Sequence, residues 1–121
     1  MLSIKNLTKI YSGNKKAVDN ISLDIESGEF IAFIGTSGSG KTTALRMINR
    51  MIEATDGQIT MNGKDVRNMN PVELRRSIGY VIQQIGLMPH MTIRENIVLV
   101  PKLLKWSKEK KDSKAKELIK L

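Results

Sequence analysis

The hydrophobic and polar positions of the first half of this chain change period several times, and each period predicts a different element. Residues 2–11 alternate loosely and residues 21–25 alternate strictly, which predicts two strands of an antiparallel layer with one exposed face. Residues 29–34 form a short apolar run that is typical of a parallel strand buried on both faces. After a glycine-rich stretch, apolar residues recur at helical spacing, which predicts a helix. These residues are Leu45, Ile48, Met51 and Ile52.

Turn and capping residues divide the second half of the chain. Residues 56–63 predict a short strand between an Asp-Gly and an Asn-Gly turn, since both dipeptides accept positive φ. Residues 70–73 (Asn-Pro-Val-Glu) combine an N-cap side chain, a proline at the first helical position and an early acid, so we expect a short helix through Arg76. The apolar run 78–82 predicts a second buried strand, which ends at Gln83.

Two further helices are predicted near the end of the chain. Thr92 and Glu95 have the spacing of a capping box, and we expect Pro101 to interrupt the helix that begins there. The last helix runs from about Ser107 to the end. This order of elements predicts an α/β fold, in which an N-terminal antiparallel β subdomain packs against an incomplete parallel-sheet core, because only two buried strands are recognised.

Composition limits the class of protein. The chain has 121 residues, 40% of them hydrophobic and 26% charged, which suits one soluble domain over residues 1–121. It has no cysteine and one histidine, so thiolate and His-cluster metal sites are excluded. The N-terminus lacks the apolar core of a signal peptide, and the longest apolar run near the end, 97–100, is too short to cross a bilayer. We therefore expect a cytoplasmic chain.

The net charge of +8 raises the question of nucleic-acid binding. Residues 102–121 hold eight lysines and three acids, so they account for +5 of it. Lysines at these positions are typical of the solvated face of a helix, and aromatic residues, which stack on single-stranded bases, make up only 4% of the chain. Nucleic acid is therefore not an expected partner, while contact with anionic lipid near a membrane partner stays open.

The strongest motif lies between the predicted strand 29–34 and the helix that follows it. Residues 35–42 read Gly-Thr-Ser-Gly-Ser-Gly-Lys-Thr and match G-x-x-x-x-G-K-[ST] at every fixed position. In such a loop, main-chain N–H groups converge on phosphate, the lysine reaches the β- and γ-phosphates, and the hydroxyl ligates Mg²⁺. A flexible Gly/Ser linker would have polar flanks on both sides. The apolar flanks here favour a nucleotide-phosphate site instead.

A phosphate loop alone does not separate kinases, GTPases, motor ATPases and transporters. Tyr11 offers an aromatic face that suits adenine, although ordinary core packing would also explain it. A guanine-binding N-K-x-D element is not recognised, because residues 62–65 read Asn-Gly-Lys-Asp and are better explained as a turn. Residues 75–83 predict a buried strand that ends in glutamine, and Pro-His-Met-Thr follows at 89–92.

Together these residues resemble the nucleotide-binding subunit of ABC transporters, and the resemblance extends over the whole chain. Residues 80–92 and 99–106 look especially like importers of glycine betaine, carnitine, choline and related quaternary amines. The resemblance implies a P-loop NTPase fold of the ABC type, truncated before the helical subdomain is complete.

The resemblance also implies ATP and Mg²⁺ as ligands and a role for each site residue. Tyr11 would stack on adenine. Lys41 would neutralise charge on the γ-phosphate, Thr42 would ligate Mg²⁺, and Thr43 is expected to bond the α-phosphate. Gln83 would contact Mg²⁺ and the attacking water and communicate with the membrane subunit, with Gln84 as the less favoured substitute. The expected nucleotide-binding residues are Tyr11, Gly35, Ser37, Gly38, Ser39, Gly40, Lys41, Thr42 and Thr43. Lys41 and Gln83 are the expected catalytic residues, and Thr42 and Gln83 the expected metal ligands.

Some parts of the family pattern are missing from the 121 residues. The L-S-G-G-Q signature, the Asp-Glu pair that supplies a metal ligand and the catalytic glutamate, and the switch histidine do not occur. His90 does not correspond to that histidine, and we interpret it as a surface loop residue rather than one that docks the membrane subunit. We therefore expect the N-terminal part of a transport ATPase that binds Mg-ATP weakly by itself and has negligible turnover.

The resemblance implies three kinds of partner: transmembrane permease subunits, a substrate-binding protein and a second ATP-binding subunit. It places the protein at the cytoplasmic face of the membrane. Two alternatives stay open. One is a non-catalytic nucleotide-binding or interaction fragment, and the other is an ABC-type ATPase for another substrate or for DNA repair or translation.

Overall fold

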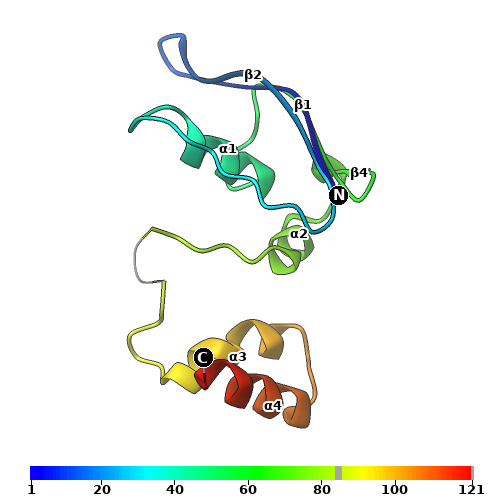
Figure 1. Ribbon diagram of the computed structural model, residues 1–121, viewed down its shortest axis with the longest axis vertical. Helices are drawn as coiled ribbons and strands as arrows, with labels where there is room; N and C mark the ends of the chain where they lie inside the picture. Colours follow the sequence, from blue (N-terminus) through cyan, green and yellow to red (C-terminus); the bar gives the residue numbers. More distant parts are fainter. Residues whose placement is uncertain (84–85, 121) are drawn as a thin grey trace. The chain divides into compact units, whose positions relative to one another are not determined.

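The computed structural model describes residues 1–83 and 86–120. The chain divides into two compact units, Met1–Ile78 and a second unit that begins at Gly79 (Figure 1). The first unit carries the sheet, the glycine-rich loop and two of the α-helices, and the second carries the other two. Within the described ranges, no helix is long and apolar enough to cross a membrane.

A four-stranded antiparallel sheet in the order β2-β1-β3-β4 is the base of the first unit. Its strands are β1 (Leu2–Tyr11), β2 (Lys15–Ile25), β3 (Asp56–Met61) and β4 (Lys64–Asp65). The predicted antiparallel layer is thus confirmed. The β1–β2 register pairs Leu2 with Ile25 and Tyr11 with Lys15, so the connecting turn is shorter than the expected 12–16. Gly13 and Asn14 form that turn at φ values of 77° and 63°.

The core of the first unit lies between the sheet and helix α1 (Lys41–Ile48) (Figure 1). Ala44 and Met47, three residues apart on one helix face, are buried against the sheet. The buried cluster consists of Ile4, Leu7, Val18, Ala44, Met47, Ile59, Val66 and Leu74. The helix ends at Ile48, so the last two apolar residues of the predicted helical pattern lie beyond its final turn.

The 3₁₀-helix η1 (Val66–Asn68) and helix α2 (Pro71–Ser77) complete the first unit. Asn70 caps α2 as predicted: its Oδ1 accepts hydrogen bonds from the N–H groups of Val72 at 2.9 Å and Glu73 at 3.3 Å. Leu74, the buried residue of α2, joins the core cluster. A local capping signal therefore starts the helix, and one apolar side chain anchors it.

The strand predictions at 29–34 and 78–82 are wrong, because neither segment is a strand in the structure. Phe30, Ile34 and Val81 are exposed over 92%, 95% and 95% of their surface. A parallel strand forms only where at least one neighbouring strand pairs with its N–H and C=O groups. In the described part of the chain every paired strand is antiparallel, so neither segment has such a neighbour.

The second unit contains α3 (Ile93–Leu103) and α4 (Lys108–Ile119). The predicted capping box starts α3: Thr92 Oγ1 accepts from the Glu95 N–H at 3.2 Å, and Glu95 Oε2 accepts from the Thr92 N–H at 2.7 Å. The bonds from Thr92 lower the pKa of the Glu95 carboxyl. Helix α4 begins close to its predicted start and is capped by Ser107, and an ion pair between Arg94 and Asp112 joins the two helices.

Pro101 lies inside α3 and does not interrupt it, so that prediction is wrong. The proline falls in the last turn, where the helix loses one internal hydrogen bond and then ends two residues later, at Leu103. The N–H of Leu104 still reaches the Val100 carbonyl at 2.9 Å, and the N–H of Trp106 reaches the Pro101 carbonyl at 3.0 Å. Pro101 thus removes only its own N–H from the helix, and the bonds around it still form.

Candidate functional site: a phosphate loop facing Tyr11

The glycine-rich loop leads directly into α1. Gly40 is the N-cap residue of this helix, with φ 90° and ψ −2°, and Gly38 has φ 82°. Both lie in the left-handed region, which glycine enters without steric cost. The first turn of α1 contains no acidic residue. The unpaired N–H groups of this turn and the helix dipole therefore present a partial positive charge that no side chain on the helix neutralises.

The side chain of Lys41 crosses back over the loop. Its Nζ donates hydrogen bonds to the carbonyl oxygens of Gly35 at 2.8 Å and Thr36 at 2.7 Å, and to Ser39 Oγ at 3.0 Å. The N–H of Ser39 also donates to the Thr36 carbonyl at 3.2 Å. These contacts close the loop around one ammonium group, so the Lys41 cation is held against the loop by three hydrogen bonds.

Gly35 has a separate steric role at the start of the loop. A Cβ at this position would lie 2.7 Å from Ser39 Oγ, closer than real Cβ contacts allow. The Ser39 hydroxyl is the same group that accepts from Lys41. A side chain at residue 35 would therefore displace the Ser39 hydroxyl from its bond with Lys41.

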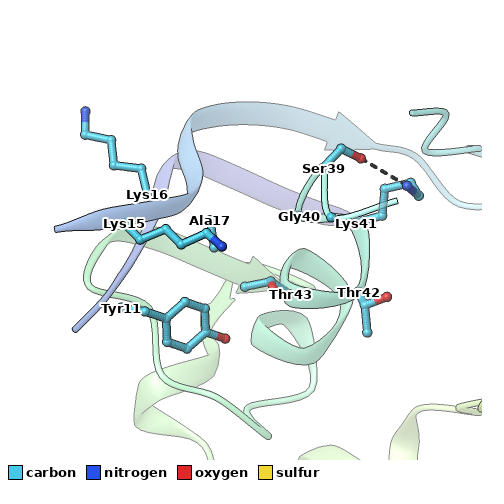
Figure 2. Close-up of a pocket in the computed structure, with 10 residues that line it drawn as sticks. Tyr11, Lys15, Lys16, Ala17, Ser39, Gly40, Lys41, Thr42 and Thr43 are labelled. Atoms are coloured by element: carbon cyan, nitrogen blue, oxygen red, sulfur yellow. Dashed lines mark hydrogen bonds between the residues drawn. The ribbon is translucent and has the colours of Figure 1, made fainter. Parts of the chain in front are cut away.

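Tyr11 and the loop line one cavity of about 430 Å³ (Figure 2). Seven of the predicted nucleotide-binding residues line it: Tyr11, Gly38, Ser39, Gly40, Lys41, Thr42 and Thr43. Gly35 and Ser37 are not among the lining residues. Gly35 acts instead through its contact with Ser39, and Ser37 lies in the turn before Gly38. The volume falls within the range of small-molecule sites.

Tyr11 lies at the C-terminal end of β1, with 43% of its surface exposed. The Lys9 ammonium lies 5.3 Å from the centroid of the Tyr11 ring and also donates to the Glu53 carbonyl at 2.8 Å. Lys9 is not a lining residue of the cavity, whereas Tyr11 is. The Tyr11 side chain is thus supported by a held cation and keeps part of its surface open for a planar ligand.

Sequence reasoning missed three residues of the cavity: Lys15, Lys16 and Ala17. Residues 12–16 were expected to form a turn, but Lys15 already belongs to β2 and pairs with Tyr11. Gly13-Asn14 is the sequence signal that could have predicted these residues in the cavity. A tight turn at these two residues brings Lys15 opposite Tyr11. The hairpin therefore adds two lysines to the rim of the site.

Gln83 belongs to the second unit, where it is exposed in the segment before α3. It does not end a strand, because residues 78–82 form none. Its predicted place beside Thr42 stays a prediction, and Gln84, the less favoured alternative, lies outside the described residues. His90 is exposed in the loop before α3, in agreement with its interpretation as a surface residue.

The glycine-rich loop and the helix α1 that follows it have the sequence and local structure of the phosphate loop of P-loop NTPases. Comparison with known families identifies the family within this class. Residues 18–121 match the model of the ABC transporter family. The chain therefore belongs to this family.

Particular relatives agree with the predicted resemblance to quaternary-amine importers. The chain is 68% identical over all its 121 residues to the carnitine transport ATP-binding protein OpuCA of Listeria monocytogenes. It is 60% identical to the glycine betaine/carnitine/choline transport ATP-binding protein OpuCA of Bacillus subtilis, again over its full length. It spans 30% and 32% of the length of these two relatives.

Solved structures confirm the predicted fold class. The dimeric structure of the bacterial ABC transporter cassette MJ0796 matches 99% of this chain and 56% of that one, with a TM-score of 0.84 and 36% identity. A post-hydrolysis state of the same cassette, bound to ADP and Pi, matches with a TM-score of 0.83 and 34% identity. The fold is thus that of an ATP-binding cassette.

Proposed function

We propose that this chain is the nucleotide-binding part of a subunit that couples ATP hydrolysis to the import of a quaternary amine such as glycine betaine, carnitine or choline. One observation carries the nucleotide part of the proposal: Tyr11 and the loop 38–43 line the same cavity. A stacking surface and an anion-binding loop on one cavity suit a ligand with a purine at one end and phosphates at the other.

The loop residues have distinct tasks in this proposal. Main-chain N–H groups of residues 37–42 would hold the phosphates at the helix N-terminus. Lys41 would exchange its neutral carbonyl acceptors, Gly35 and Thr36, for charged γ-phosphate oxygens, because a hydrogen bond between two charged groups is stronger. Thr43 would bond the α-phosphate.

The residues at the site also fit Mg²⁺. In the described ranges, no group of three His, Cys, Asp or Glu residues could hold a metal by itself. Mg²⁺ does not need such a group, since it is usually bound by one or two protein ligands together with substrate phosphates and water. The Thr42 hydroxyl is the candidate ligand in the cavity, and Gln83 is the candidate second ligand. The ion would neutralise charge that develops on the phosphates.

We infer that the 121-residue chain binds ATP without appreciable turnover. None of the residues that line the cavity is acidic, so none is placed to act as the base that polarises an attacking water. In the complete subunit we propose hydrolysis with a second ATP-binding subunit. The permease subunits and a substrate-binding protein are the other proposed partners, at the cytoplasmic face of the membrane.

Titration of the purified chain with Mg-ATP tests the binding role. We expect saturable binding of ATP that Lys41→Ala abolishes, with no steady release of phosphate from either protein. Steady hydrolysis that depends on Lys41 would contradict the binding-only inference. Circular dichroism of the two proteins shows whether the substitution leaves the fold intact.

Uptake assays test the transport role. Cells that lack the intact gene, with and without a complementing copy, are compared for uptake of labelled carnitine, glycine betaine and choline. A labelled phosphonate is the control substrate, because the chain is also 41% identical over 101 residues to a phosphonates import ATP-binding protein of Oceanobacillus iheyensis. Complementation of phosphonate uptake alone would favour an ABC ATPase for another substrate. A non-catalytic interaction fragment would instead bind the permease subunits in a pull-down and leave uptake unchanged.

A further inference from the structure

Three lysines line the cavity: Lys15, Lys16 and Lys41. None of the lining residues is acidic. Two of the three ammonium groups are already engaged. Lys41 Nζ is bonded within the loop, and Lys16 Nζ lies 3.0 Å from both carboxylate oxygens of Asp19. Among the described residues, Lys15 Nζ has no hydrogen-bond or ion-pair partner. The cavity therefore has one cation that the protein itself does not satisfy.

The strand register explains why the two neighbouring lysines differ. Successive side chains of a strand point to opposite faces, so Lys15 and Lys16 on β2 must diverge. Lys15 is the β2 residue paired with Tyr11 on β1. Figure 2 shows the Lys15 side chain extending toward the side of the pocket where Tyr11 and Thr43 lie, while Lys16 points away from them.

We propose that Lys15 binds the α-phosphate of the nucleotide, an inference that rests on the proposed nucleotide site. With the purine on Tyr11 and the terminal phosphates in the loop, the ribose and α-phosphate span the stretch between them. Lys15 and Thr43 line the same cavity as Tyr11 and the loop, and Figure 2 draws both of them on the side of the loop where Tyr11 lies. An ammonium group carries three donors and no acceptor, and an α-phosphate oxygen offers it a negative charge that a ribose hydroxyl does not.

The size of the effect follows from exposure. Lys15 is an exposed residue near a hairpin turn, so solvent and salt screen its charge. Exposed ion pairs contribute little to binding free energy, and hydrogen bonds between charged groups contribute more. Between these two limits, we expect removal of the Lys15 charge to weaken binding about three- to tenfold. The loss is expected to shrink as the ionic strength rises.

The test compares Lys15→Gln with Lys64→Gln, since the two substitutions remove the same charge from exposed strand positions, one in the cavity and one outside it. Affinities of the full chain for Mg-ATP and for Mg-2′,3′-dideoxy-ATP are measured by calorimetry at low and high salt. We expect Lys15→Gln to weaken both nucleotides about three- to tenfold. Lys64→Gln is expected to change either affinity by less than about twofold, because Lys64 is exposed on β4 and does not line the cavity. Lys15→Arg is expected to retain most of the affinity.

Each other outcome overturns the inference in a recognisable way. Equal effects of the two substitutions would show a general charge effect rather than a contact of Lys15. A loss for ATP that disappears with dideoxy-ATP would assign Lys15 to the ribose. If the wild-type chain binds ATP through Lys41 but Lys15→Gln changes nothing, the Lys15 contact fails and the proposed function stands. If the folded wild-type chain binds no nucleotide, both fail.

Discussion

The main-chain carbonyl oxygen of Ala17 lies so close to Gly40 that a Cβ on residue 40 would be 2.1 Å from it. Strand β2 therefore packs directly on the backbone of the phosphate loop, one residue before α1 begins. The same strand supplies Lys15 and Ala17 to the cavity. The position of the hairpin relative to the loop thus depends on a close backbone contact that only glycine permits at residue 40.

Gly40→Ala should damage the site more than Gly38→Ala. Both residues have positive φ, so both substitutions strain the backbone by about 1–2 kcal/mol. Only position 40 adds a clash, since a Cβ at position 38 meets nothing within 4 Å. We expect Gly40→Ala to abolish measurable ATP binding and to lower the thermal unfolding midpoint further than Gly38→Ala. Equal shifts in the two midpoints would show that β2 does not press on the loop.

Lys41→Ala should weaken the loop even without nucleotide. It removes three hydrogen bonds, to Gly35, Thr36 and Ser39, each contributing about 1 kcal/mol when intact. We expect faster amide hydrogen exchange over residues 35–40 than in the wild type, with no change in the helices α3 and α4. Lys41→Arg keeps the charge and serves as the control. Unchanged exchange in Lys41→Ala would contradict the role of Lys41 in closing the apo loop.

Tyr11→Phe and Tyr11→Ala separate stacking from other roles of Tyr11. Removal of one aromatic–base stack typically costs about 1–3 kcal/mol, or roughly five- to 150-fold in affinity. Tyr11→Phe keeps the ring, so ATP affinity should stay within about twofold, while Tyr11→Ala should show the full loss. Inorganic triphosphate, which has no base, should bind both variants equally. Equal losses of ATP affinity in the two variants would assign the role to the hydroxyl instead.

Arg75 joins α2 to the end of the phosphate-loop helix. Its guanidinium donates to the carbonyl oxygens of Asn49, at 3.2 Å, and Arg50, both just past the C-terminus of α1. Arg75→Gln should lower the free energy of unfolding by about 1–3 kcal/mol, because charged donors contribute more than neutral ones. The side chain of Arg76, also exposed, makes no hydrogen bond or ion pair within the described residues, so Arg76→Gln should change it by less than about 0.5 kcal/mol. Chemical denaturation of the two variants measures both values.

Asp65 should give the chain a component of stability that depends on pH. Its side chain is 12% exposed and accepts hydrogen bonds from the Arg67 guanidinium, the Arg67 N–H and Gln58, which together hold the pKa of the Asp65 carboxyl well below its ordinary value. The stabilisation is present above the unfolded-state pKa of about 3.9 and is lost as the pH falls from there toward the lower folded-state pKa.

Unfolding of Asp65→Asn between pH 2 and pH 7 measures this component. We expect a loss of about 1 kcal/mol at neutral pH, typical of a helix N-cap, and a flatter decline of stability below about pH 4. Asp24→Asn, at an exposed position of β2, is the control and should follow the wild-type curve. Parallel acid curves for the wild type and Asp65→Asn would contradict the assignment.

Local chemistry determined what the sequence predicted correctly. The two predicted caps, Asn70 and Thr92, bond to backbone three residues away or less, so a short stretch of sequence contains the whole interaction. The hydrogen bonds that close the loop 35–42 are equally local, because Lys41 Nζ donates only to Gly35, Thr36 and Ser39 among the residues that the structure describes.

Interactions between segments far apart in sequence decided which apolar runs form strands and which side chains meet at the cavity. Residues 29–34 and 78–82 have the composition of buried strands, but a strand also requires hydrogen-bonding neighbours, and these depend on which segments meet in space. The β1–β2 register likewise decided that Lys15 faces Tyr11 and that Ala17 touches Gly40. The sequence alone thus identified a phosphate loop and its family. Only the tertiary structure brought the aromatic ring and the additional lysines to that loop, because side chains far apart in sequence become neighbours only through packing and strand pairing.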